Sequence, residues 1–569
     1  MLRLSVVVAL LASLVALPSA ATPEQATQLL PGVTFQKEVQ FTPHGPVVVD
    51  EIVAPRPGGL YTLAPALARS TISGGLESVP QLEQETAAAS TASAVVGING
   101  DSFGARGYPT GIVLQNGVLL HGAFASRASV GIDAAGTLHV RRLTFTGTWK
   151  DAGQRRPLAG VNQVPRPGQV VLFTPAWGPT TPTVAGAAEV VLEPFPAAAP
   201  DTDLSAPVTA QSTAGGGTAI PADGAVLMSV GASGTLPALL DDAPVGGKVT
   251  VRLILPPDWA SVTNAIGGGP VLVSNGRPVF HTGESFDAGA LAQDDARAGI
   301  GQLADGRILF VAVDGNQPGY STGVSVYDLA RTMARLGAVT AAAVDSGPSV
   351  TAAFDGELLS RPRTAGGRPV KDAWLLEYAG VYAPPPSPLL DRSAAAAGEQ
   401  LAYTIVRPST VTASVSSPSG KAFTVDSGAR DPGTYRFTWS SFDAEGTYHW
   451  YVSASDDQNQ RSVADETFQY DLTLSHLRAP KVAHARTGVA VRFDLARSAT
   501  VTLQIETPAG AVVRTLPPVE LQAGANVVRW DGTLSDGSTA AYAGAYVARV
   551  TAVSAVGTIV LTAPFALRG

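Results

Sequence analysis

Two stretches of sequence decide the fold expected for the centre of this chain: RAGIGQLADGRILFVAVDG, residues 297–315, and LGAVTAAAVDSGPSV, residues 336–350. In the first stretch, the apolar and β-branched run 308–313 predicts a buried strand. In the second stretch, the apolar run 338–344 predicts another strand of the same kind. Each run ends directly at an aspartate, so each predicted strand delivers a carboxylate at its C-terminal end.

A helix is predicted between these two strands. Ser325 starts a capping-box-like sequence, apolar residues then recur at helical spacing, and Gly337 occupies the position of a C-terminal cap. A strand, a helix and a strand over this length predict a βαβ unit with two parallel strands in one sheet. We therefore expect Asp314 and Asp345 at the same edge of the sheet, where open α/β sheets bind ligands.

The composition limits the architecture and the partners. With 569 residues, the chain is too long for one core, so about three or four domains are expected. The net charge of −8 argues against a nucleic-acid partner. No cysteine is present, which excludes disulfides, zinc-thiolate sites and cysteine nucleophiles. The sequence requires no cofactor, although a divalent cation such as Ca²⁺ on aspartate side chains remains open because no spacing demands or forbids one.

The N-terminus predicts export. A short basic start is followed by the apolar run 4–17 and by small residues up to Ala21, which together indicate a cleaved signal peptide over residues 1–21. A retained membrane anchor is the alternative, but the run is short for a spanning helix and no basic cluster follows it. We expect a secreted or cell-surface protein without a membrane span in the mature chain.

A polar turn follows the predicted strand at residues 94–98. Asn99 and Asp101 in this turn can present side chains to a ligand, although an ordinary tight turn explains the same residues. The glycine cluster 267–269 could let backbone amides approach a phosphate group. It lacks the Lys-Ser/Thr ending of a P-loop, so nucleotide binding is weakly supported.

The composition changes after residue 378. The proline-rich stretch 383–388 predicts a linker, and two similar segments with period-two alternation follow it, which predict two small β-sandwiches. The second segment resembles the Ig-like domain of flagellar hook-capping proteins in its Trp530-Asp-Gly and Gly544-x-Tyr pattern. Trp439 and Trp530 could stack on sugars, but core tryptophans of a sandwich are the more common case.

The order of the central segments resembles the phosphodiester glycosidase family, relatives of the enzyme that uncovers mannose 6-phosphate. The collinear segments are Asn-Gly-Asp-Ser-Phe at 99–103, Ala-Ile-Gly-Gly-Gly-Pro at 265–270, Arg-Ala-Gly-Ile-Gly at 297–301, Val-Asp-Gly at 313–315 and Val-Asp-Ser-Gly-Pro-Ser at 344–349. The resemblance spans roughly residues 94–378. Where the family has Asp-Gly-Gly-Gly-Ser-Ser, this chain has Asp-Ser-Gly-Pro-Ser-Val at 345–350, and Pro348 removes a backbone donor.

The resemblance implies a site that cleaves a sugar-1-phosphodiester. Such chemistry needs carboxylates at the anomeric carbon and an anion clamp for the phosphate. The resemblance assigns the catalytic role to Asp345 and Asp314. The substrate-binding candidates are Arg297 as the main clamp, together with Asn99, Asp101, Ser349, Gly347, Arg127 and Arg368. Each aspartate could instead cap its own turn, and Arg297 could form a surface salt bridge.

The expected fold class is an α+β catalytic-type domain with a mixed sheet, followed by two all-β Ig-like sandwiches. The expected boundaries are a signal peptide at 1–21, a β-rich lead-in at 22–93, the glycosidase-like domain at 94–380, a linker at 381–392, and the sandwiches at 393–475 and 476–569. The expected function is hydrolysis of a sugar-1-phosphodiester, such as an N-acetylglucosamine-1-phosphodiester, in a phosphorylated cell-wall or extracellular glycan. The alternative is a non-catalytic surface glycan-binding or structural protein that keeps the fold. The C-terminal modules would then serve as spacers or attach either protein to the cell wall.

Overall fold

The computed structural model describes residues 26–89, 92–122, 126–151, 153–231, 239–279, 283–484, 488–508, 512–534 and 544–568. The expected signal peptide lies outside these residues. The structure is mostly β, with 52% of residues in strands and 8% in helices. The expected α+β class with a mixed sheet is therefore wrong, whereas the two C-terminal β-sandwiches fit the expectation. No helix in the described ranges has the length and apolar character needed to cross a bilayer.

The centre of the molecule contains a main sheet of eight strands. In spatial order these are β1 (Thr27–Leu30), β2 (Val33–Thr42), β3 (Gly45–Ala54), β22 (Ile308–Val313), β21 (Arg297–Leu303), β23 (Ala338–Ala343), β19 (Val271–Ser274) and β20 (Arg277–Pro278). Every neighbouring pair in this sheet is antiparallel. The sheet is therefore not mixed.

The pairing is antiparallel because β21, the strand before the predicted βαβ unit, lies between the two strands of that unit and forms a hairpin with the first of them. β21 and β22 form this hairpin, and Gly306 at its turn has a φ of 90°, which suits glycine. β23 then pairs with the other side of β21. β22 and β23 run in the same direction, as the sequence predicts, but β21 separates them and pairs with both. The main sheet also includes the N-terminal lead-in, because β3 pairs with β22.

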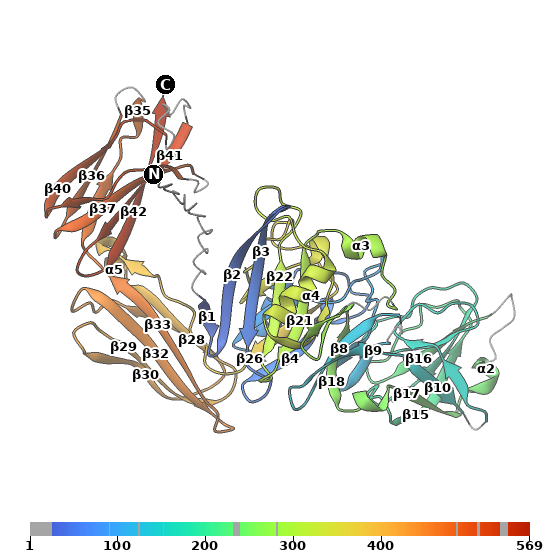
Figure 1. Ribbon diagram of the computed structural model, residues 1–569. Helices are drawn as coiled ribbons and strands as arrows, with labels where there is room; N and C mark the ends of the chain where they lie inside the picture. The colour runs from blue at the N-terminus through green and yellow to red at the C-terminus, as the bar shows by residue number, and fades with distance from the viewer. Residues whose placement is uncertain are drawn as a thin grey trace, which may run out of the picture.

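Helix α4 (Val326–Arg335) covers the outer face of the main sheet (Figure 1). Ser325 caps the helix by accepting a hydrogen bond from the Asp328 backbone N–H. Its apolar face, which includes Leu329 and Met333, packs on Leu272 and Val311 of the sheet. This helix is the one predicted from the sequence between residues 325 and 337.

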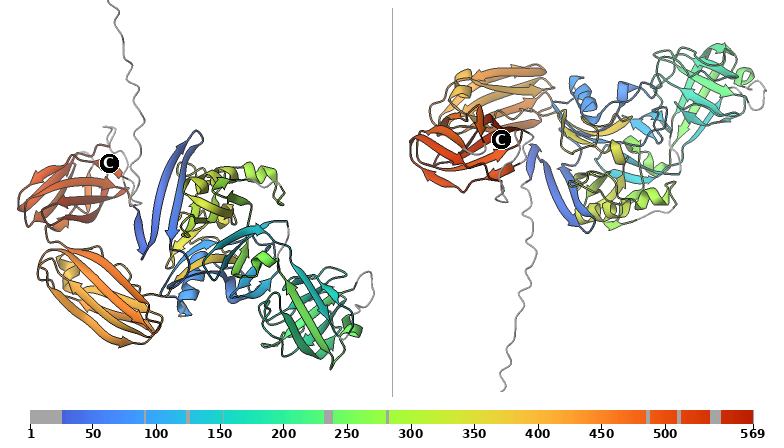
Figure 2. Two further views of the ribbon diagram at one scale, coloured as in Figure 1. Left: turned by 60° about the horizontal axis from the view of Figure 1, so that its bottom comes forward. Right: turned by 90° about the horizontal axis from the view of Figure 1, so that it is seen from above.

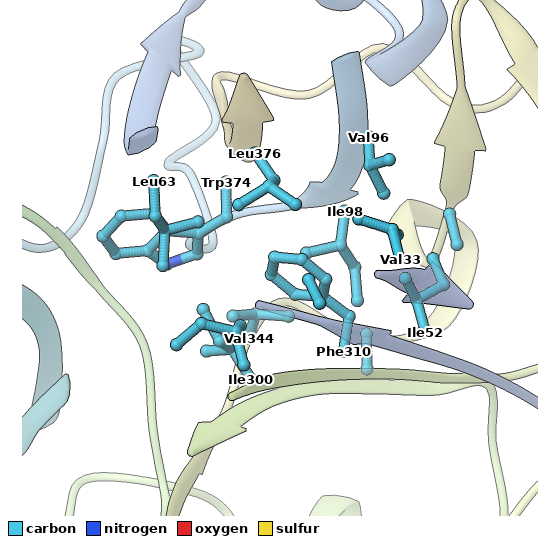
Figure 3. Close-up of a cluster of buried hydrophobic side chains, with 14 of the residues drawn as sticks. Val33, Ile52, Leu63, Val96, Ile98, Ile300, Phe310, Val344, Trp374 and Leu376 are labelled. Atoms are coloured by element: carbon cyan, nitrogen blue, oxygen red, sulfur yellow. The ribbon is translucent and has the colours of Figure 1, made fainter. Parts of the chain in front are cut away.

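A second antiparallel sheet packs against the inner face of the main sheet. Its strands in spatial order are β25 (Glu357–Leu358), β24 (Ala352–Phe354), β5 (Ala94–Asn99), β26 (Asp372–Tyr378) and β4 (Tyr61–Leu67). The core between the sheets joins Ile300 and Phe310 to Ile98, Trp374 and Leu376 (Figure 3). Helix α1 (Val79–Ala88) covers the outer face of the second sheet.

A separate β-rich lobe is inserted into this central domain (Figure 1). Its strands in spatial order are β11 (Arg156–Leu158), β10 (Thr146–Lys150), β17 (Lys248–Ile254), β15 (Asp203–Ser212), β14 (Ala187–Leu192), β16 (Ala225–Val230), β13 (Val170–Phe173) and β12 (Gly160–Val161). A five-stranded sheet contributes to the cores of both the lobe and the central domain. Its strands are β7 (Val118–His121), β6 (Val113–Gln115), β18 (Val262–Gly267), β8 (Ala128–Asp133) and β9 (Leu138–Arg142). The short helices are α2 (Leu239–Asp242) in the lobe and α3 (Ala288–Ala292) before β21.

The first C-terminal sandwich follows the central domain in the chain and is hydrogen-bonded to the segment that leaves this domain. Its larger sheet contains β27 (Leu389–Leu390), β33 (Arg461–Tyr470), β32 (Gly446–Asp456), β29 (Ser409–Ser416) and β30 (Ala422–Arg430). β28 (Glu399–Ile405) pairs with β31 (Gly433–Trp439), and α5 (Arg392–Ala397) precedes them. The Val381 backbone N–H donates to the Ser462 hydroxyl at 2.9 Å, and Tyr382 exchanges backbone hydrogen bonds with Thr404. Both contacts join the start of the expected linker to the sandwich.

The second C-terminal sandwich ends the chain. One sheet contains β34 (Leu474–Arg478), β36 (Val489–Leu495) and β40 (Gly524–Trp530). The other contains β35 (Val482–His484), β42 (Thr558–Arg568), β41 (Gly544–Val553), β37 (Ala499–Glu506), β38 (Val512–Thr515) and β39 (Val519–Leu521). Trp439 and Trp530 are 8% and 1% exposed, so both are core residues of their sandwiches. Figure 2 shows the two sandwiches at one end of the molecule and the inserted lobe at the other.

Candidate active site

A cavity of about 310 Å³ opens beside the C-terminal end of β23 and the start of β21. Three predicted site residues line it: Asp345, Arg127 and Arg297. Phe286, Ser102 and the turn Gly269-Pro270 line it as well. Segments that lie far apart in the chain, from Ser102 to Ser346, thus converge here, which is the arrangement expected of a ligand site.

Asp345 is the half-buried carboxylate of this cavity. Burial raises the pKa of Asp345, while hydrogen bonds from the Ser349 hydroxyl and the Ser346 backbone N–H, together with Arg368 and Arg127, lower it. The backbone of Asp345 is also fixed. Its N–H donates to the carbonyl of Gly100 at 2.8 Å, and its carbonyl accepts from Asn99 Nδ2 at 2.9 Å.

Asn99 therefore holds the Asp345 loop in place and does not line the cavity. Its side chain is fully buried, and its Oδ1 accepts from the Thr351 backbone N–H at 3.1 Å. Through its two amide ends, Asn99 bridges both sides of the turn that contains Ser349. The polar residue that ends β5 thus positions the carboxylate that follows β23.

Arg127 supplies a guanidinium group to the cavity. Its Nη1 donates to Ser102 Oγ and to Thr110 Oγ1, at 2.5 and 3.0 Å, and its Nη2 lies 3.6 Å from Asp101 Oδ1. The guanidinium lies over the ring of Phe286, with 4.6 Å to the ring centroid. Together these contacts fix one orientation of the arginine.

Asp101 is buried behind Arg127. Burial raises the pKa of Asp101 to about 6, although Arg127 and the Ser102 N–H lower it and the charge of Asp345 raises it. Its close neighbour Asp372 is fully buried as well, and burial together with the charge of Asp101 raises the pKa of Asp372 well above its ordinary value. A Cβ built on Gly267 would lie 2.1 Å from Asp101 Oδ2, so the glycine cluster makes room for this carboxyl group.

Two residues from the connections to the second sheet approach Asp345: Ser349, which precedes β24, and Arg368, which precedes β26. Arg368 Nη1 donates to Ser349 Oγ at 3.2 Å, and its guanidinium lies 5.0 Å from the ring centroid of Phe103. Gly347 starts the short 3₁₀ helix η3 (Gly347–Ser349) with a φ of 65°, a conformation that favours glycine. This turn brings the Ser349 hydroxyl back to the Asp345 carboxylate.

Arg297 lines the cavity, but its hydrogen bonds are made to the backbone. Its Nη2 donates to the carbonyls of Ala290 and Gln293 at 2.6 and 2.8 Å, and its Nε donates to the carbonyl of Val324 at 3.3 Å. Its residue surface is only 6% exposed, and burial lowers its pKa. The structure thus makes Arg297 a tether for the α3 segment, and Arg127 and Arg368 are the arginines next to Asp345.

Asp314 lies apart from the cavity. Its two carboxylate oxygens accept from the Arg361 backbone N–H, both at 3.1 Å, and Oδ2 also accepts from the Tyr320 hydroxyl at 3.1 Å. Burial raises the pKa of Asp314. The side chain therefore ties the loop after β22 to the loop at Arg361. Asp314 and Asp345 follow strands of the same direction, but β21 separates those strands.

Several residues of this site were not among the candidates predicted from the sequence. Ser102 and Phe103 belong to the turn already noted at 99–103, so they could have been included. Thr110, Phe286 and Asp372 lie in segments without a local signal, and only the tertiary structure brings them to Arg127 and Asp101. Within the described ranges, no group of three or more His, Asp or Glu side chains is arranged to hold a metal ion.

Comparison with known proteins connects this geometry to a family. The family model for phosphodiester glycosidases matches residues 203–377. This part of the chain resembles the phosphodiester glycosidases. The match includes Asp345, Arg368 and Arg297, whereas Asn99, Asp101 and Arg127 come from the chain before it. The FlgD Ig-like domain model matches residues 480–555, in the second C-terminal sandwich.

Solved structures resemble part of this chain. A hypothetical protein from Synechocystis shares 24% identity at a TM-score of 0.53, over 63% of this chain and 64% of that one, which shows a common fold. A protein of Burkholderia pseudomallei described as exported shares 23% identity at a TM-score of 0.47, over 58% of this chain and 74% of that one. The catalytic domain of zebrafish N-acetylglucosamine-1-phosphodiester alpha-N-acetylglucosaminidase shares 12% identity at a TM-score of 0.33, over 63% and 86%. No curated protein matches the chain.

Proposed function

We propose that this protein is a secreted glycosidase that hydrolyses a sugar-1-phosphodiester, of the N-acetylglucosamine-1-phosphodiester type, in a cell-wall or extracellular glycan. One observation supports this most directly. The carboxylate of Asp345 lies in the same cavity as the guanidinium of Arg127, and Arg368 contacts the hydroxyl group that donates to that carboxylate. The resemblance to the phosphodiester glycosidases supports the same reaction class.

The nature of the leaving group explains why Asp345, with Arg127 and Arg368 nearby, is sufficient as the catalytic carboxylate of the proposed hydrolysis. An ordinary glycosidase uses one carboxyl group as an acid for the leaving oxygen and another as a base or nucleophile. When the sugar is linked through phosphate, the leaving group is a phosphate monoester, which is already a weak base. Charge stabilisation by arginine can therefore replace protonation by an acid.

In the proposed reaction, ionised Asp345 acts as a general base on a water molecule. The water oxygen forms a bond to the anomeric carbon, and the bond from that carbon to the phosphate oxygen breaks. The phosphate monoester leaves with the electron pair, and the water proton passes to Asp345 and then to solvent. Arg127 binds the phosphate oxygens, while Arg368 and Ser349 orient the Asp345 carboxylate and favour its ionised form against the effect of burial.

A chromogenic diester of N-acetylglucosamine-1-phosphate and p-nitrophenol tests this proposal. Cleavage at the anomeric carbon releases p-nitrophenyl phosphate, which gives colour only when a phosphatase is added. We expect phosphatase-dependent colour from the wild type and a loss of about 10²- to 10⁴-fold in Asp345→Asn. Arg436→Gln, a change of an exposed arginine in the first sandwich, is the control and should retain full activity. Colour without phosphatase, or full activity in Asp345→Asn, would contradict the proposal.

The second candidate is a non-catalytic glycan-binding protein. The Asp345 turn favours it, because Pro348 provides no N–H and the carboxylate already accepts from Ser346 and Ser349. This candidate predicts no turnover by the wild type on several sugar phosphodiesters, with and without Ca²⁺, but retained binding of the same diesters in calorimetry.

A further inference from the structure

An exposed face of the second C-terminal sandwich carries a group of arginine side chains. β34, β36 and β40 form a three-stranded sheet whose inner face includes Val491 and Phe493 of the sandwich core. Because side chains alternate along a strand, the residues between them point outward. The outward residues include Arg478, Arg492 and Arg529, all exposed. β40 lies at the outer edge of the molecule in Figure 1.

Arg478 and Arg492 are direct cross-strand partners in the β34–β36 ladder. The Cβ atoms of such partners lie about 4.5–5.5 Å apart, and like charges in this arrangement repel one another. None of the three arginines forms an ion pair or a side-chain hydrogen bond within the described ranges. Two arginines are thus placed opposite each other at a cost in stability, with no carboxylate between them.

The acidic side chain on this face is held by another residue. Asp494 Oδ2 lies 2.9 Å from His476 Nδ1. His476 belongs to an irregularity of the ladder between Ser475 and Arg478, and it has a φ of 53°, which is unusual for a residue other than glycine. Irregularities of this type redirect side chains. This one brings His476 to Asp494, so Asp494 is engaged with the histidine.

The face is hollowed as well as charged. A depression of about 470 Å³ is lined by His476, Arg478, Arg492, Asp494, Asn526 and Val527, among others. The whole chain has a net charge of −8, so this positive depression is opposite in sign to the protein around it. An electrostatic contrast of this kind attracts an anionic partner.

We propose that this face binds a polymer whose backbone is linked through phosphodiesters, such as a polyol phosphate, and holds it to the protein independently of the catalytic cavity. Paired guanidinium groups match phosphate oxygens in a bidentate manner, which favours phosphate as the recognised group. Phe493 is among the residues at the depression, but it is only 2% exposed and its side chain belongs to the sandwich core, so no phenylalanine ring is presented to a ligand here. A single-stranded nucleic acid would use exposed aromatic rings for its bases, so the residues of this face favour a polymer without bases.

The test measures binding of poly(glycerol phosphate) to the full mature chain. All proteins carry Asp345→Asn, so that binding is not confused with turnover. In the Arg478→Gln/Arg492→Gln double variant, affinity should fall about tenfold or more. The slope of log affinity against log salt should decrease by about 2, one unit for each lost arginine. Arg436→Gln/Arg461→Gln, a pair of exposed arginines on separate sheets of the first sandwich, is the charge-matched control and should retain affinity.

Three results would overturn this inference: unchanged affinity in the Arg478/Arg492 variant, an equal loss in the control pair, or tighter binding of polyglutamate or single-stranded DNA than of poly(glycerol phosphate). Thermal unfolding separates lost binding from lost folding, because removal of two like charges should leave the melting temperature unchanged or higher. The inference does not depend on the proposed glycosidase activity. That activity is tested separately on the small chromogenic diester with Asp345 intact.

Discussion

The Asp345 carboxylate and the Arg368 guanidinium share one hydroxyl group, that of Ser349. Arg368 Nη1 donates to Ser349 Oγ at 3.2 Å, and the Ser349 hydroxyl donates to Asp345. A serine that is fully buried thus joins the proposed base to a positive charge in the loop before β26. This relationship determines how the activity should respond to pH and to substitution.

Ser349→Ala should raise the pKa of Asp345, because the substitution removes a hydrogen bond that lowers it. Since the ionised form is the active base, the acid limb of kcat/KM should move to higher pH, and activity on the plateau should fall about 10- to 100-fold. The pH profile of the chromogenic assay measures both effects. Ser360→Ala is the control. It removes another buried hydroxyl, which accepts a hydrogen bond from the Ala352 backbone N–H, and it should leave the acid limb at the same pH.

Asp101→Asn should have the opposite effect on the acid limb. Burial raises the pKa of Asp101 to about 6, and the charge of Asp345 adds to this rise; the repulsion between the two carboxylates is mutual. Removal of the Asp101 charge should lower the pKa of Asp345, so the acid limb should move to lower pH. An acid limb that moves upward in Asp101→Asn would show that Asp101 acts mainly by holding Arg127 in place.

Arg127→Gln and Arg297→Gln should separate substrate binding from folding. Arg127 is the proposed phosphate clamp, so its loss should lower kcat/KM about 10²- to 10³-fold with little change in the melting temperature. Arg297 donates to three backbone carbonyls. Its loss should reduce the free energy of unfolding by about 1–3 kcal/mol, because buried acceptors lose their donors. Steady-state kinetics and urea unfolding of both variants give the two quantities. The reverse pattern would make Arg297 the clamp.

Asp372→Asn should stabilise the protein increasingly as pH rises. The folded-state pKa of Asp372 is raised well above its unfolded value by burial and by Asp101. Its protonated form therefore favours folding below the unfolded pKa, and that contribution is lost as pH rises through the folded pKa. The asparagine does not titrate, so the stability difference between variant and wild type should grow over this window. A difference that is constant with pH in chemical unfolding would contradict this assignment.

The sequence predicts the local elements of the central domain more accurately than their pairing. The strand at 308–313, the helix capped by Ser325 and the strand ending before Asp345 are all present. The βαβ pattern suggested a mixed sheet, because periodicity does not reveal that β21 inserts between β22 and β23. The class was wrong for that reason and because the inserted lobe adds further strands.

In the candidate site, too, the sequence predicts local features better than the contacts between distant segments. Asp345 could be singled out because it ends a strand within a distinctive segment, and the turn at 99–103 likewise marks its neighbourhood. Arg127, in contrast, follows no motif, and only its contacts with Ser102, Thr110 and Phe286 place it in the cavity. Arg297 is the opposite case. It lies in a motif and is predicted as the phosphate clamp, but its guanidinium donates to backbone carbonyls that the sequence does not reveal.

The central claim is that the bond broken joins the anomeric carbon to oxygen. Hydrolysis of the N-acetylglucosamine-1-phosphodiester in ¹⁸O-labelled water tests it most directly, with mass spectrometry of both products. If Asp345 activates water toward the anomeric carbon, the label must appear in the sugar and the phosphate monoester must be unlabelled. Label in the phosphate would identify a phosphodiesterase and contradict the mechanism proposed for Asp345 and Arg127.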